Sequence, residues 1–194
     1  MGICFLSYTV SDGNLSEILA DPALVWRVVE PDDDTAYLHE AGIGRPQSLL
    51  SKLFGKPRPV PPVRTLAFSE HELRVLDLDK SWDGLRACLK ACAPQAPDFF
   101  EGEGPVGTVD IGYGPGLYIR SDHLARIAGS LLAVSEAQLL DALRTTDFTG
   151  TYLGDLWARS DDDCRDYLLH NFRDLQAFLR HAARHSLGAV LRFT

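Results

Sequence analysis

The sequence is short of positive charge. Its 194 residues include 19 lysine and arginine residues against 27 aspartate and glutamate residues, so the formal net charge is −8 with histidine neutral. The phosphate backbones of DNA and RNA repel such a chain, and nucleic acid is therefore excluded as an expected partner. The same charge favours association with a basic protein.

Long apolar runs are also missing. No stretch approaches the roughly 18 apolar residues that a membrane-spanning helix requires. The first residues have neither the basic region nor the apolar region of a signal peptide. The four cysteines are Cys4, Cys88, Cys92 and Cys164. Together these features predict a cytoplasmic protein that has no membrane partner and carries free thiols.

Motifs for nucleotide binding and for hydrolysis are absent. Gly112, Gly114 and Gly116 do not fit the G-x-G-x-x-G pattern, because the third glycine comes two residues after the second. No Gly-Lys-Ser/Thr follows them, so the stretch is not a P-loop. The chain has no G-x-S-x-G nucleophile elbow.

Metal-binding patterns are incomplete. His181 and His185 have the four-residue spacing of zinc proteases, but the residues between them, 182–184, lack the catalytic glutamate. Their position near a helix end indicates cations that suit the helix dipole. Cys88 and Cys92 are four residues apart with no second pair, which is typical of core residues. We expect no metal, no cofactor and no catalytic residue.

The patterning that is present indicates an α+β fold. Apolar periodicity predicts a buried strand at residues 3–10 and a final strand at residues 189–193. Helix-start signals stand near Asn14, Asp21, Ser69, Asp79, Ser121, Ser135 and Ser160, and the last of these begins the longest helix. Because strands are few and irregularly spaced, we expect a single domain with a small mixed or antiparallel sheet packed with several helices.

The most distinctive stretch is the glycine-dense segment 110–119, which we interpret as a strand–turn–strand corner that leads into the helix at Ser121. Its structural interpretation is a corner where backbones approach closely. Its functional interpretation is the lip of a ligand pocket, in which Asp110 and His123 could form an acid/base pair. The residues that would line this pocket are Lys80, Trp82, Asp110, Tyr113 and His123.

Acidic residues gather in three places and are candidates for contact with a basic partner. They are Asp32, Asp33, Asp34, Glu101, Glu103, Asp161, Asp162 and Asp163. The alternative is that each cluster is a solvated turn or a helix start. Acids in the first turn of the longest helix suit the positive end of its dipole.

Several pieces together resemble the YfbM-like family of small bacterial proteins, whose function is unknown. They are Met1-Gly2 before a short apolar strand, Leu76–Leu85, Gly112–Tyr118, the closing helix with Tyr167 and Phe172, and the tail 188–191. The resemblance implies a single α+β domain and brings no catalytic residues. Many members have histidine where this chain has Asp83. The proline-rich segment 55–62 looks like an insertion.

Two functions remain open on these grounds. The first is a non-enzymatic protein-binding domain, and its more specific form is an immunity protein that occludes the active site of a basic toxin. This hypothesis rests on the charge of −8, on the missing catalytic motifs and on analogy with small acidic bacterial domains. The second is an enzyme or small-molecule-binding protein whose pocket lies at the Gly112–Tyr118 corner. The oligomeric state is not predicted.

Overall fold

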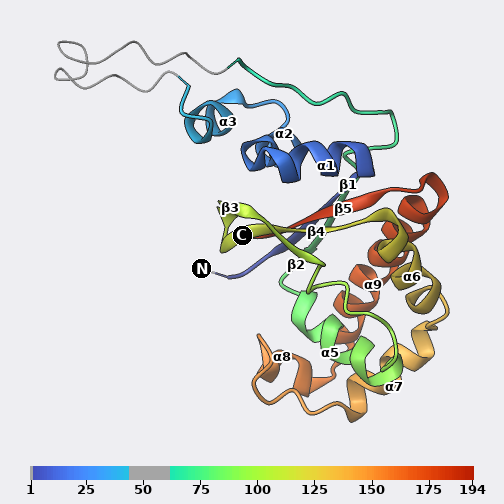
Figure 1. Ribbon diagram of the computed structural model, residues 1–194. Coiled ribbons are helices and arrows are strands. Elements are labelled where there is room, and N and C mark those ends of the chain that lie inside the picture. The colour runs from blue at the N-terminus through green and yellow to red at the C-terminus, as the bar shows by residue number, and fades with distance from the viewer. Residues whose placement is uncertain (1, 44–61) are drawn as a thin grey trace.

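The computed structural model describes residues 2–43 and 62–194. Its centre is a sheet with helices on both faces (Figure 1). The helices from the first part of the chain cover one face, and those from the middle and the C-terminal part cover the other. This three-layer α+β arrangement agrees with the predicted fold class. Most of the proline-rich segment 55–62 lies outside the described residues.

In the described part of the chain, the sheet has five antiparallel strands in the order β2-β1-β5-β4-β3. These strands are β1 (Phe5–Val10), β2 (Val75–Asp79), β3 (Gly104–Gly112), β4 (Gly114–Ile119) and β5 (Gly188–Phe193). The predicted first and last strands are thus adjacent at the centre. Phe5 pairs with Phe193, and Val10 pairs with Gly188. Both chain ends therefore lie at one end of the sheet (Figure 1).

Short helices cover the first face: α1 (Asp12–Ala20), the 3₁₀ helix η1 (Pro22–Val25), α2 (Trp26–Val29) and α3 (Asp34–Glu40). The Ser11 side chain caps α1, three residues before the predicted cap at Asn14. The predicted helix after Asp21-Pro22 begins as a 3₁₀ turn and continues into α2. Apolar side chains of these elements pack against Tyr8, Val10 and Ile111 of the sheet.

The second face carries α5 (Trp82–Cys92), α6 (Ser121–Leu131), α7 (Glu136–Thr145), α8 (Gly154–Arg159) and α9 (Asp162–His185). The predicted starts at Ser121 and Ser135 are confirmed, the second with a full capping box to Gln138. The longest helix is confirmed too, although Asp161 caps it and Ser186 ends it. Cys88 and Cys164 are fully buried, and Cys92 is half-buried beside this core.

At Ser69, where the sequence predicts a short helix or a turn, the structure has a turn. The Glu72 carboxylate accepts a hydrogen bond from the Ser69 amide at 2.8 Å, but it also accepts one from the Ser11 amide at 2.7 Å, so it closes a turn against α1. One local prediction is wrong: Leu76 and Leu78 count among the apolar residues that predict the helix from about Asp79, but they belong to edge strand β2. None of the helices in residues 2–43 and 62–194 could cross a bilayer.

Candidate functional site

The structure places Lys80 and Trp82 beside the start of the chain. The Trp82 indole donates a hydrogen bond to the Ile3 carbonyl at 3.1 Å, and the Tyr152 hydroxyl accepts one from the Ile3 amide at 2.9 Å. The rings of Trp82 and Tyr152 stack at 6.1 Å. A side chain at Gly2 would collide with the Lys80 side chain. These residues therefore hold the segment before β1 in place.

Asp79 extends this polar network at the end of β2. Its carboxylate accepts hydrogen bonds from the Cys4 thiol at 3.2 Å and from the Tyr167 hydroxyl at 2.9 Å. Its backbone has φ 44°, a left-handed conformation that costs free energy in a non-glycine residue. The hydrogen bond to Asp79 and partial burial raise the pKa of Cys4, so this thiol is a poor nucleophile. The geometry indicates a structural clamp.

The glycine corner is confirmed as the β3–β4 hairpin. Asp110 pairs with Pro115, and Tyr113 sits at the exposed turn. The Tyr113 amide donates a hydrogen bond to the Phe193 carbonyl at 2.7 Å, and the Phe193 ring packs on Trp82 with centroids 5.0 Å apart. The corner and Trp82 are thus linked through the end of β5.

His123 lies elsewhere. It follows β4 at the opposite end of the hairpin, where its Nδ1 atom is 3.4 Å from a carboxylate oxygen of Glu103. Asp110 and His123 therefore lie toward opposite ends of β3, and the structure does not pair them as acid and base. None of the five predicted pocket residues lines either of the two cavities described below.

The three acidic clusters are dispersed over the molecule. Asp33 caps α3, and Asp34 pairs with Arg27. Asp161 caps α9, and Asp162 pairs with Arg165. Figure 1 places α3 in the layer opposite the one that contains α8 and α9. Asp32 and Asp163 are exposed. The structure therefore does not merge the three clusters into one surface.

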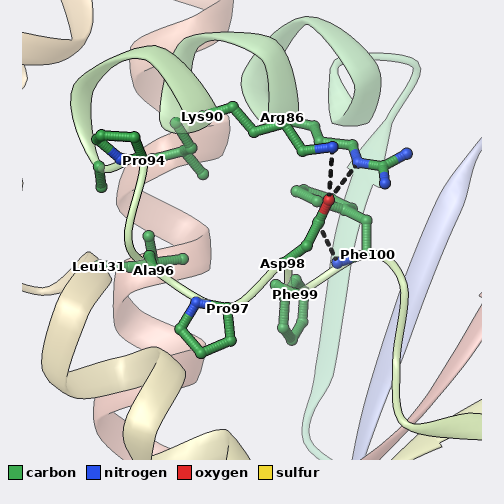
Figure 2. Close-up of a pocket in the computed structure, with 11 residues that line it drawn as sticks. Arg86, Lys90, Pro94, Ala96, Pro97, Asp98, Phe99, Phe100 and Leu131 are labelled. Carbon is green, nitrogen blue, oxygen red and sulfur yellow. Dashed lines mark hydrogen bonds and ion pairs between the residues drawn. The ribbon is translucent and has the colours of Figure 1, made fainter.

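A cavity of about 280 Å³ lies between α5, the loop at residues 93–100 and the end of α6. Its lining is mainly apolar, as Figure 2 shows for Pro97, Phe99 and Leu131. The two phenylalanines of the loop are buried and anchor it to the core, since the Phe5 ring contacts both. A second cavity, of about 550 Å³, is lined by residues between 147 and 158.

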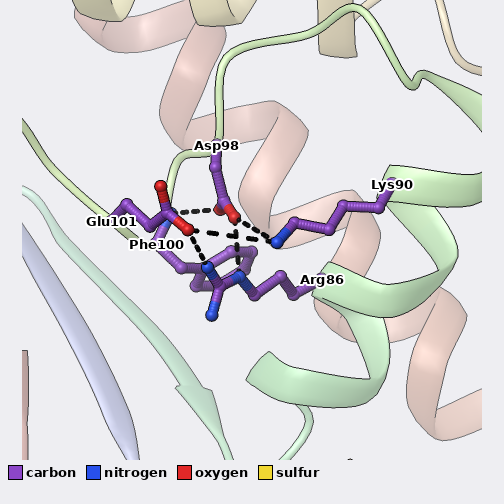
Figure 3. Close-up of polar contacts among 5 residues, drawn as sticks. All are labelled: Arg86, Lys90, Asp98, Phe100 and Glu101. Atoms are coloured by element: carbon purple, nitrogen blue, oxygen red, sulfur yellow. Dashed lines mark hydrogen bonds and ion pairs between the residues drawn. The ribbon is translucent and has the colours of Figure 1, made fainter.

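Charged residues form a compact network beside the first cavity (Figure 3). The Asp98 carboxylate accepts hydrogen bonds from Arg86 Nε at 2.7 Å and from the Phe100 amide at 3.0 Å, and Lys90 Nζ lies 3.0 Å away. Glu101 pairs with the other side of the Arg86 guanidinium. Burial alone would raise the pKa of Asp98, but hydrogen bonds from Lys90 and Arg86 bring it below its usual value.

The two cations and the two acids of this network balance in charge. One of the acids is nevertheless accessible to solvent. The Asp98 side chain is 13% exposed, whereas the Glu101 side chain is 64% exposed. Glu101, which the sequence predicts for partner contact, thus lies next to the cavity-lining residue Phe100. The residues predicted for a site do not include the charged partners of Glu101, which are Arg86, Lys90 and Asp98. Arg86 and Lys90 share one face of α5 by their four-residue spacing, but the sequence gives no sign that the loop folds back to place Asp98 between them.

Within the described part of the chain, no three histidine, cysteine, aspartate or glutamate side chains are arranged to hold a metal ion. An apolar group of about side-chain size fits the cavity, and a cation can approach the exposed Glu101 carboxylate.

No curated protein matches the chain. Among solved structures, the chain is similar to YfbM from Escherichia coli, described as a protein of unknown function, with 13% identity and a TM-score of 0.48. The alignment covers 98% of this chain and 99% of that one. The family model for a domain of unknown function, DUF1877, matches residues 1–191. The chain therefore belongs to this YfbM-like family, DUF1877.

Proposed function

We propose that this chain is a protein-binding domain that receives an apolar side chain of a basic partner in the cavity between α5 and the loop at residues 93–100. The observation that carries the proposal is the apolar cavity of about 280 Å³ with the exposed Glu101 carboxylate beside it. Binding energy at protein interfaces concentrates where an anchor side chain fills such a pocket and charged groups surround it.

The charges favour a basic partner. Asp98 and Glu101 together neutralise Arg86 and Lys90, so these cations do not attract an acidic partner strongly. Glu101 is the more exposed of the two acids in the network, and the chain carries a net charge of −8. A partner segment with an apolar residue next to lysine or arginine matches both features. The long-range charge would also speed the encounter with such a partner.

We further propose that the partner is a toxin and that the chain is its immunity protein. Supporting grounds are the acidic charge and the analogy with small acidic bacterial domains that block basic toxins. Binding to a toxin's active-site face would neutralise it without any catalysis by this chain.

The test uses two variants of equal charge. Ala96→Arg places a long cation in the cavity, whereas Gln95→Arg adds the same charge at the exposed neighbouring position outside the lining. Affinity purification from the native host, quantified by mass spectrometry, should recover a basic protein with the wild-type chain and with Gln95→Arg. Ala96→Arg should lose it. Equal recovery by the two variants would contradict the proposed site.

Co-expression tests the toxin assignment separately. Each toxin encoded beside the gene is expressed with the wild-type chain, with Ala96→Arg or with Gln95→Arg, and growth is recorded. The proposal expects the wild-type chain and Gln95→Arg to protect the cells from one toxin and Ala96→Arg to fail. If the wild-type chain protects against none of them, the immunity assignment is wrong, while the purification still tests partner binding.

A further inference from the structure

Three histidines from two distant segments form a cluster beside β2. The imidazole rings of His71 and His185 stack with centroids 3.7 Å apart and an interplanar angle of 27°. The ring of His181 lies 4.7 Å from that of His185, and its Nε2 atom is 2.8 Å from the His71 carbonyl oxygen. Because a carbonyl oxygen can only accept, His181 Nε2 must carry the hydrogen. The cluster therefore fastens the turn at residues 69–74 to the last turns of α9.

Residues of that turn also make hydrogen bonds to strand β1 of the sheet and to the start of helix α1. The Leu73 amide donates to the Thr9 carbonyl at 2.8 Å, and the Arg74 amide donates to the Thr9 hydroxyl at 3.0 Å. Glu72 accepts hydrogen bonds from the Ser11 amide and from the Asn14 side chain. A change in the histidine cluster can thus be transmitted to β1 and α1 through a single short turn.

Charged groups of both signs surround the cluster. A Glu70 carboxylate oxygen is 3.5 Å from His71 Nε2. His185 has the opposite environment. Desolvation lowers its pKa, and the neighbouring His71, His181 and Arg184 lower it further, while the more distant attraction of Glu70 opposes the shift. If both stacked rings carried a proton, two positive charges would face each other with ring centroids 3.7 Å apart, and they would repel.

We propose that His71, His181 and His185 form an acid-sensitive latch. It holds the 69–74 turn on α9 while the stack carries at most one proton, and it releases the turn when both stacked rings are protonated. This device is independent of the partner-binding function proposed above. It gives the chain a local conformational change in mild acid at a turn whose residues do not line the cavity.

The direction of the pH dependence follows from linkage. The pKa of His185 is lower in the closed state than its ordinary value of about 6.5, so the released state binds more protons. The latch is therefore stable above about pH 6.5 and weakens as the pH falls below that value. For one proton the opening equilibrium changes by up to about tenfold per pH unit.

Amide hydrogen exchange of the full chain at pH 7.5 and pH 5.5, corrected for intrinsic rates, tests the proposal. The Leu73 and Arg74 amides should lose several-fold more protection on acidification than core amides such as that of Val190. In His185→Gln this extra loss should disappear. His170→Gln is the matched control, because His170 is exposed on the same helix and pairs with Asp174. It should behave as the wild-type chain does.

Equal acid sensitivity of the two amides in wild type and His185→Gln would overturn the latch. A loss of sensitivity in His170→Gln would do the same. Should His185→Gln fail to fold, His71→Gln provides the same comparison from the other side of the stack. A titration of the His185 ring protons by NMR gives a direct reading, and an ordinary or raised pKa there would contradict the proposal.

Discussion

The hydroxyl group of Tyr167 donates a 2.9 Å hydrogen bond to the carboxylate of Asp79, and this bond joins α9 to the end of β2. The same carboxylate receives the Cys4 thiol, so one residue with a left-handed backbone connects three segments that are far apart in the sequence. Desolvation alone would raise the pKa of Asp79. The hydrogen bonds from Cys4 and Tyr167 outweigh it, and the net shift is downward.

We expect Tyr167→Phe to raise the pKa of Asp79 and to lower the free energy of unfolding at pH 7 by about 1 kcal/mol, because one hydrogen bond to an ionised group is lost. A carboxyl with a depressed pKa stabilises the fold above its unfolded-state value and loses that effect as pH falls through the folded-state value. The stability difference between variant and wild type should therefore shrink in acid. NMR titration and urea unfolding measure both quantities. Tyr113→Phe, at an exposed turn, should change neither.

Gly84 provides a test of packing between α5 and α8. A methyl group on this glycine would come within 2.2 Å of the indole ring of Trp157, which is fully buried. We expect Gly84→Ala to destabilise the protein by about 1–3 kcal/mol through overpacking. Gly129→Ala is the matched control, since this exposed helical glycine has no atom within 4 Å of the added methyl group. It should gain up to about 1 kcal/mol from helix propensity. Urea midpoints that fall equally in the two variants would contradict the packing argument.

Local chemistry made parts of this fold predictable. Ser121 and Ser135 marked helix starts because their signals act within one turn, and the glycine corner was recognisable because three glycines alternate between apolar residues. β2 was missed although its burial alternates along the strand. Its two leucines precede an amphipathic helix closely, and the positive φ of Asp79, which separates strand from helix, leaves no sequence signal.

The candidate site was harder to predict from the sequence than the fold. Glu101 was selected for its charge, but its neighbours Arg86 and Asp98 meet only because the loop between them is anchored by two buried phenylalanines. Lys80 and Trp82 were selected as pocket residues, and they instead contact the start of the chain. Such pairings depend on tertiary contacts between distant segments. The histidine cluster illustrates the same limit, since His71 is 110 residues away from His181.

Asp98 should be the residue of the charged network on which stability depends most. Asp98→Ala leaves Arg86 Nε and the Phe100 amide without this acceptor in a half-buried setting, so we expect a loss of about 2–3 kcal/mol at pH 7. Glu101→Ala removes a more exposed ion pair and should cost less than about 1 kcal/mol. Because the pKa of Asp98 is depressed, the difference between Asp98→Ala and wild type should diminish as the pH falls below about 4. Urea unfolding at pH 7 and pH 3 checks both statements, and equal losses in the two variants would contradict them.

Gly112 tests the glycine corner as a structural element. A methyl group at this position would lie 1.9 Å from the Phe193 carbonyl oxygen, which also accepts the hydrogen bond from the Tyr113 amide. Since the obstacle is backbone, a side-chain rotation cannot relieve the collision. The hairpin must separate from the end of β5, and we expect Gly112→Ala to lower the free energy of unfolding by about 2 kcal/mol or more.

Thr108→Ala, which is exposed on the same strand, should have a free energy of unfolding within about 0.5 kcal/mol of that of the wild type. Trp82 contacts Phe193, so its fluorescence should also change in Gly112→Ala before unfolding begins. If stability and fluorescence both match the wild type, the close approach of the corner to β5 is not required for the fold.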